Sequence, residues 1–267
     1  MQNLSLPNVR APAVAGTFYP ADAAELRRDV LRRLARADVR TNPPKAIVAP
    51  HSRYADSGAV AASAFASVAP LRGRVSRVVL IGPAHRSSFR GVALPEASAF
   101  ATPLGLLHVD EQARRSLRSL PQVIASDRAH AGEHTLEVQL PFVQEVLGPD
   151  VHIVPLLVGN ATDYDVAGAL TRVWGGPETL VVVSSDLSHY LSYEEARAVD
   201  GATASAIERL LPDELGPDSA CGRASMRALL LCARAHGLRA ETLDLRSSGD
   251  TAGVRDEVVG YGAFALS

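Results

Sequence analysis

Runs of apolar residues alternate along this chain with segments in which apolar residues recur every three or four positions. The runs are rich in Val, Ile and Leu, which is typical of strands buried on both faces, and the periodic segments are typical of amphipathic helices. This alternation predicts an α/β fold with a mainly parallel central sheet and helices on both of its faces. The predicted strands are 45–51, 77–85, 151–159, 179–186, 240–245 and 258–266. The predicted helices are 23–38, 57–69, 134–148, 164–174, 193–211 and 222–236.

Local signals indicate where two of these helices begin. Asp56 or Ser57 can cap the second predicted helix, because both side chains accept hydrogen bonds from the free N–H groups of a first turn. Pro141 is expected to bend or to start the helix over 134–148, since proline lacks the N–H that a helix interior needs. No repeat, low-complexity linker or break in composition interrupts the pattern, so residues 1–267 are predicted to form a single domain.

Composition and charge narrow the class of protein. The hydrophobic content of 47% and the charged content of 21% are ordinary for a soluble globular protein. A formal net charge of -2 gives no electrostatic reason to expect a nucleic acid or an acidic membrane as partner. The N-terminus lacks the basic and apolar regions of a signal peptide, and no stretch approaches the roughly 18 apolar residues of a membrane span. With two cysteines and hence no disulfide framework, a cytoplasmic location is predicted.

Three of the predicted strands end in side chains that can titrate or bind a metal. The first reads "AIVAPH" and ends at His51, the second reads "VVLIGPAH" and ends at His85, and the third reads "LVVVSSDLSH". That third strand stops at Ser184 and is followed by Asp186 and His189. Ligands of open α/β sheets bind outside the carboxyl ends of the strands. If the three strands are parallel neighbours, these side chains are predicted to share one site.

Two further segments can contribute to such a site. Cys221 lies just ahead of the helix predicted over 222–236, where the helix N-terminus is expected to lower the pKa of the thiol. Glu133 directly precedes another predicted helix, and His134 is its first residue. Two imidazoles with a carboxylate or a thiolate suit Fe(II), Zn(II) or Cu better than Mg or Ca. From the residues alone, a carboxylate as third ligand would resemble a non-heme Fe(II) triad, and a thiolate could equally hold zinc.

Motifs in order over nearly the whole chain resemble the Memo family. They read "RAPAVAGTFYPAD", "IVAPHSRYADSG", "LIGPAH", "FATPLG", "EHTLEVQLPF", "VPLLVG", "VVSSDLSHY", "ACGR" and "RSSGDTAGVRDEVVGYGAFAL". The resemblance implies a fold related to the class III extradiol ring-cleaving dioxygenases, the LigB-like enzymes. It also implies that His51, His85 and Cys221 are the metal ligands, with the thiol in the place of the dioxygenases' carboxylate.

What the resemblance implies about function is broader. Eukaryotic Memo proteins are described as cell-motility proteins that bind phosphotyrosine peptides and, in some accounts, as metal-dependent redox enzymes. Prokaryotic relatives often accompany a radical S-adenosylmethionine protein, which is therefore a possible partner. The leading expectation is an oxygenase or redox enzyme with Fe(II), or else Cu or Zn, acting on a small molecule. In it His189 would be the general acid and base, Asp186 would orient a ligand, and Glu133 and His134 would line the pocket.

The chain departs from the family pattern beside both histidines. Ser52 and Arg53 follow His51 where the family has a small pair, and Arg86 follows His85. Arg53, with Tyr54 next to it, is predicted to bind substrate, because a guanidinium offers a bidentate fork to a carboxylate or phosphate.

A second departure affects the surroundings of the second histidine. Ala84 replaces a Ser or Asn that could orient the His85 ring.

The cations Arg53 and Arg86 also favour a second hypothesis, namely a binding module that captures an anionic or phosphotyrosine-type peptide or a small acid without catalysis.

Overall fold

The computed structural model describes residues 8–37, 42–251, 253 and 255–267. The helices are α1 Ala23–Leu34, α2 Tyr54–Ser67, α3 Glu111–Leu117, α4 Asp127–Ala131, α5 Leu140–Leu147, α6 Asp163–Arg172, α7 Tyr193–Glu208, α8 Arg223–Ala235 and α9 Ser248–Thr251. The strands are β1 Val9–Arg10, β2 Ala46–Ala49, β3 Arg77–Pro83, β4 Val92–Leu94, β5 Ala99–Thr102, β6 Gly105–His108, β7 Val123–Ala125, β8 His152–Val158, β9 Thr179–Ser184, β10 His189–Leu191, β11 Ala240–Ser247 and β12 Val258–Leu266.

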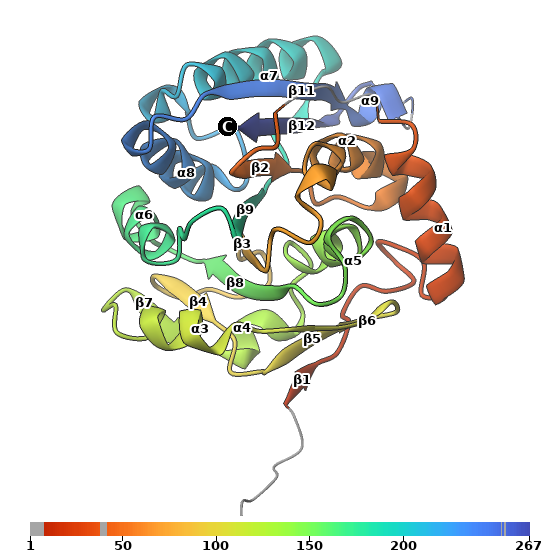
Figure 1. The fold of residues 1–267 in the computed structure, drawn as a ribbon. Coiled ribbons are helices and arrows are strands. Elements are labelled where there is room, and N and C mark those ends of the chain that lie inside the picture. The colour runs from red at the N-terminus through yellow and green to blue at the C-terminus, as the bar shows by residue number, and fades with distance from the viewer. Residues whose placement is uncertain (1–7, 38–41, 252, 254) are drawn as a thin grey trace, which may run out of the picture.

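A mixed sheet runs through the middle of the molecule in the order β10-β12-β2-β9-β3-β8-β4-β7, and β11 pairs with β12 (Figure 1). Its centre, β2-β9-β3-β8, is entirely parallel. Outside this centre the pairing is mixed: β12 runs against β2 on one side and β4 runs against β8 on the other, whereas β4 and β7 are parallel. The predicted α/β class is confirmed, and parallel pairing is concentrated in the strands that end at the candidate site.

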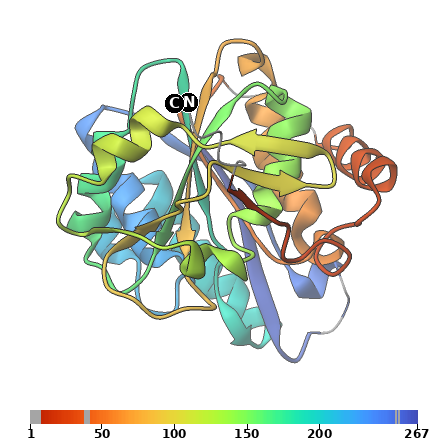
Figure 2. The same ribbon diagram turned by 90° about the horizontal axis from the view of Figure 1, so that it is seen from below.

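Alternate residues of the central strands enter two separate cores. On β9, Leu180 and Val182 pack with α1, α2 and α5, whereas Val181 and Val183 pack with α6, α7 and α8. Seen from below, the two helical layers lie on opposite sides of the sheet (Figure 2). Burial on both faces explains why the strands read as continuous apolar runs rather than alternating ones. None of the helices among the described residues is long and apolar enough to cross a membrane.

The predicted elements lie within a few residues of the observed ones, and the main corrections concern helix starts and short strands. Helix α2 begins at Tyr54, so Asp56 and Ser57 lie inside the helix rather than at its cap. Its N-cap residue is Arg53, whose side chain makes no capping hydrogen bond. Helix α5 begins at Leu140 rather than at residue 134, beside Pro141 as expected. Helix α1 ends at Leu34, and position 38 of the predicted helix lies outside the described residues. Short strands such as β4, β7 and β10 carry too few residues for a visible periodicity.

A buried ion pair fastens the N-terminal segment to the body of the protein. Glu137 is fully buried and accepts hydrogen bonds from Arg10 Nη1 at 2.7 Å and from Tyr19 Oη at 2.6 Å. It also accepts the backbone N–H groups of Ala13 and Val14. The carboxylate is thereby saturated, as a buried charge must be. The segment it holds includes residue 18, which lies at the site described next.

Candidate metal centre

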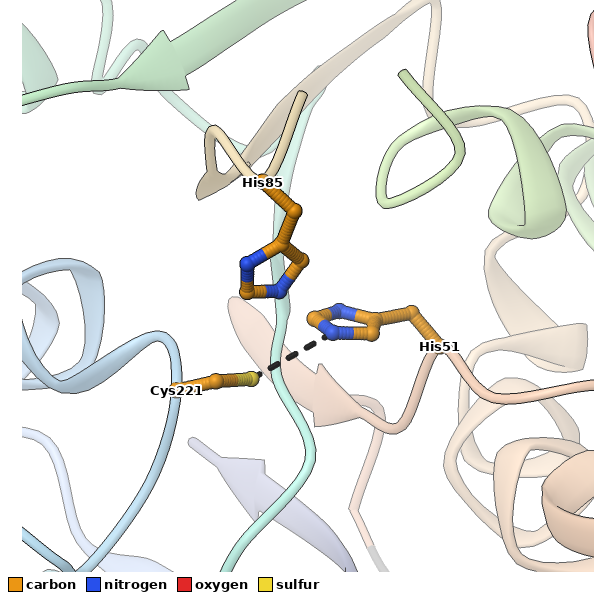
Figure 3. Close-up of side chains that lie close together, drawn as sticks. All are labelled: His51, His85 and Cys221. Atoms are coloured by element: carbon orange, nitrogen blue, oxygen red, sulfur yellow. Dashed lines mark hydrogen bonds between the residues drawn. The ribbon is translucent and has the colours of Figure 1, made fainter. Parts of the chain in front are cut away.

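Three loops bring the candidate ligands together at one edge of the sheet. His51 follows β2 and His85 follows β3, while Cys221 lies just ahead of α8 (Figure 3). Strands β2 and β3 both pair with β9 in parallel, so their carboxyl ends meet. One nitrogen of each ring and the Cys221 sulfur all lie within 4.8 Å of one another. His51 Nε2 is 3.3 Å from Cys221 Sγ. The three residues could hold a metal ion between them.

The hydrogen bonds around His51 determine which ring nitrogen is free. Ser184 Oγ donates its one proton to Thr135 O at 2.6 Å and accepts from Gln139 Nε2 at 2.9 Å. His51 Nδ1 lies 3.1 Å from the same hydroxyl oxygen. Because that hydroxyl has no further proton to give, His51 Nδ1 must be the donor. The lone pair is therefore on Nε2, the nitrogen that points at Cys221, which is the tautomer a metal ligand needs.

Asp186 holds the backbone at His51 rather than occupying the ligand position itself. Its Oδ1 accepts the backbone N–H of His51 at 2.8 Å, and its Oδ2 accepts from Ser52 Oγ at 2.7 Å. The side chain is 4% exposed, and Oδ2 lies 4.0 Å from His51 Nε2. The carboxylate thus orients the first histidine and places a negative charge beside it.

Glu133 does the same for the loop that carries the second histidine. One carboxylate oxygen accepts the backbone N–H groups of His85 at 2.6 Å and Arg86 at 3.0 Å. The other accepts those of His134 and Thr135 and lies 3.1 Å from the ring nitrogen Nδ1 of His134. Burial alone would raise the pKa of Glu133, but the contact with the His134 ring and the backbone hydrogen bonds lower it to about 2. Glu133 is therefore an ionised support for the His85 loop.

We expect Glu133→Gln to weaken Zn²⁺ binding by about 10- to 100-fold, the usual cost of losing a partner that orients a ligand. In either orientation of the amide, an NH₂ group would face two backbone N–H donors, so the loop must move. Competition with a chelator measures the affinity, and Glu145→Gln serves as the matched control, since Glu145 lies on α5, pairs with Arg27 and lies outside the ligand cluster. Equal affinities for Glu133→Gln and the natural protein would contradict this role.

Burial also sets the protonation of the candidate ligands. It lowers the pKa of His51 to about 4, against the opposing charge of Asp186, so this ring is neutral at pH 7. Burial lowers the pKa of His85 as well, against the charge of Glu133. The pKa of the Cys221 thiol is raised to about 12 by burial and by Asp186. The expected lowering by the helix N-terminus is therefore wrong, because removing a thiolate from water outweighs a helix dipole.

The candidate ligands open into a cavity of about 620 Å³, which we call the metal cavity. Its wall includes His134 and Phe18, whose rings are 4.7 Å apart, and His189.

His189 Nδ1 donates to Leu187 O at 2.8 Å, so Nε2 is the nitrogen left free. A bulge in β10 follows, and Tyr190 there has a φ of 58° and is 73% exposed at the cavity wall. Bulges of this kind often re-aim a side chain beside a site.

The two residues predicted to bind substrate lie in different surroundings. Arg53 lines the metal cavity with an exposed side chain and pairs with Asp56 at 2.9 Å. Tyr54 is buried, donates its hydroxyl to Val138 O at 2.7 Å, and does not line this cavity. Arg86 does not line it either, although its backbone N–H is held by Glu133.

Sequence reasoning gave no role to Thr135, Gln139 or Ser184, which together fix the His51 ring. Ser184 stands out in the sequence only as the polar end of an apolar strand. Thr135 and Gln139 lie in "EHTLEVQLP" without any signal of their own, because their bonds to Ser184 join segments far apart in the chain.

Comparison with known proteins gives the family. The family model described as "Memo-like protein" matches residues 10–265, which include all three candidate ligands and nearly the whole chain. The chain belongs to the Memo family. A MEMO1 family protein of Aquifex aeolicus is 34% identical over 264 residues, covering 95% of this chain and 97% of the relative. A MEMO1 family protein of Methanosarcina acetivorans is 35% identical over 272 residues, covering 97% and 99%.

One solved structure has a similar fold at much lower sequence identity. An uncharacterized protein from Escherichia coli K12 aligns with a TM-score of 0.51 over 80% of this chain and 98% of that chain. At 12% sequence identity this likeness shows the fold alone.

Proposed function

We propose that this Memo protein is a metal-dependent oxygenase or redox enzyme acting on a small molecule, with Fe(II) as the preferred metal and Cu or Zn as the alternatives. The observation that supports it is the convergence of two imidazoles and a thiol within 4.8 Å at the wall of the metal cavity. A protein that only binds peptides has no physical need for three ligands of this kind beside its pocket.

The donor atoms fit the proposed metals. Two imidazole nitrogens and a thiolate suit Fe(II), Cu and Zn, whereas Mg and Ca prefer oxygen. His51 already presents the lone pair of Nε2, and the Asp186 and Glu133 carboxylates hold the two histidine loops. Three protein ligands leave further positions for substrate. When bound, the metal would supply Lewis acidity and, if it is Fe or Cu, redox capacity.

The remaining residues would bind substrate and move a proton. His189 has a free Nε2 in a ring that lines the metal cavity, and a neutral imidazole can take a proton from a phenolic hydroxyl. Phe18 and His134 form an aromatic wall against which a planar substrate can lie. A catechol-type molecule meets both requirements, and it is the substrate class that we propose to test first.

The test combines metal content with oxygen uptake. Protein purified anaerobically is expected to hold iron near one equivalent and to consume oxygen with catechol. His189→Ala should keep the metal and lower the rate about 10²- to 10⁴-fold, the usual contribution of a general acid or base. His51→Ala should lose both metal and activity. Apo protein that takes up no Fe(II), Cu or Zn would sink the proposal, as would a His189→Ala rate equal to the natural one.

Anion capture without catalysis is a second candidate function, favoured by the exposed Arg53 on the wall of the metal cavity. It would be supported by metal-free protein that binds phosphotyrosine, and by loss of that binding in Arg53→Gln.

A further inference from the structure

A second cavity adjoins the metal cavity. It encloses about 760 Å³, and Phe18 and Arg53 line both cavities. Its other walls come from the N-terminal segment over residues 16–20, from α1 and from the start of α2. The two helices pack against each other on the same face of the sheet (Figure 1). The two cavities are therefore neighbours with these two side chains at their common border, and we call the second one the arginine cavity.

The arginine cavity is positively charged, although the protein as a whole is slightly acidic. Arg28, Arg32 and Arg33 of α1 line it together with Arg53. The opposing carboxylates are Glu25 and Asp29 in the lining and Asp56, which pairs with Arg53. The net charge of the whole chain is -2. An excess of guanidinium groups in a concave surface focuses a positive potential and attracts oxyanions.

One of these guanidinium groups is held in place by its surroundings. Arg33 donates from Nε to Asp29 Oδ2 at 2.9 Å, and its side chain is 18% exposed. It also packs over Gly58 of α2, where an added Cβ would lie 3.1 Å from Arg33 Cζ. A fixed guanidinium loses little freedom when it binds an anion. Arg28 is exposed, and no hydrogen bond or ion pair joins its side chain to the other described residues.

We propose that the arginine cavity binds the phosphate or carboxylate end of the substrate whose other end enters the metal cavity. The substrate class would then be an elongated molecule with a planar, metal-binding head and an anionic tail. This inference rests on the proposed function for the head of the molecule, whereas the anion site itself can be tested without metal.

The first test is calorimetric titration of the metal-free protein with inorganic phosphate at low salt. The double variant Arg28→Gln, Arg33→Gln should bind phosphate about tenfold more weakly, since charge-assisted hydrogen bonds are the strong ones. Arg27→Gln is the matched control, because Arg27 lies on the same helix but does not line the arginine cavity. Gly58→Ala should also weaken binding, without a change in charge, because the added methyl group displaces Arg33.

The second test links the two cavities. Zn²⁺-loaded protein should bind 3-(3,4-dihydroxyphenyl)propanoate about tenfold more tightly than 4-propylcatechol, and the double variant should remove the difference. A phosphate affinity that the double variant leaves unchanged, or equal affinities for the two catechols, would overturn the inference even if the protein holds iron and consumes oxygen. Phosphate binding that depends on these arginines in a protein that takes up no metal would instead overturn the proposed function and leave the anion site standing.

Discussion

Cys221→Ser is expected to weaken Zn²⁺ binding at pH 7 by more than about 100-fold, the upper end of what losing a residue that merely orients a ligand costs. A neutral hydroxyl replaces a thiolate, which is the one candidate ligand that would carry a negative charge. Cys232→Ser is the matched control, since Cys232 is buried within α8 and lies outside the ligand cluster.

The pH dependence of this affinity distinguishes a lost ligand from a distorted fold. The pKa of Cys221 is raised to about 12, so a metal must displace its proton, and the affinity should rise about tenfold per pH unit between pH 6 and 8. His51, with a pKa lowered to about 4, is already neutral in that range and adds nothing to the slope. In Cys221→Ser the slope should vanish. A natural protein whose Zn²⁺ affinity is flat from pH 6 to 8 would argue against the thiolate as a ligand.

Glu137→Ala is expected to lower the free energy of unfolding by about 3–5 kcal/mol, the cost of leaving one partner of a buried ion pair uncompensated. Arg10, whose side chain is 6% exposed, would lose its only carboxylate partner among the described residues. The N-terminal segment would lose the two backbone contacts and the Tyr19 bond that the same carboxylate accepts. Arg10 also donates to Glu133 O at 2.6 Å, so the support of the His85 loop should loosen as well.

Urea unfolding measures this loss. Glu214→Ala, which removes an ion pair with Arg209 in which both side chains are exposed, should cost less than about 1 kcal/mol. If the two variants unfold at the same midpoint, the buried pair does not stabilise the fold as argued.

The meeting of His51 and His85 could be predicted from the sequence because it follows from one rule. Long apolar runs are visible without an alignment, and parallel neighbours must present their carboxyl ends together. The choice of Cys221 over Asp186 as the third member of the cluster came from the resemblance to the Memo family, and the residues alone left it open.

Other features could not be predicted, because they depend on contacts between distant segments. The Ser184 hydroxyl forms hydrogen bonds with Thr135, Gln139 and His51, and no local sequence pattern predicts such bonds. The sign of the pKa shift at Cys221 depends on how much protein surrounds the thiol, which a position next to a helix does not reveal. The arginine cavity likewise forms where α1, the start of α2 and residues 16–20 pack together.

The wide spacing of the three candidate ligands along the chain bears on the order in which the protein matures. In a zinc finger the ligands are close in sequence, so the metal can drive folding of an otherwise unfolded chain. Here the ligands meet only after β2, β9 and β3 have paired and α8 has docked, which are contacts of large sequence separation. The polypeptide should therefore fold first and receive its ion afterwards, at a site whose histidine loops Asp186 and Glu133 already hold in place.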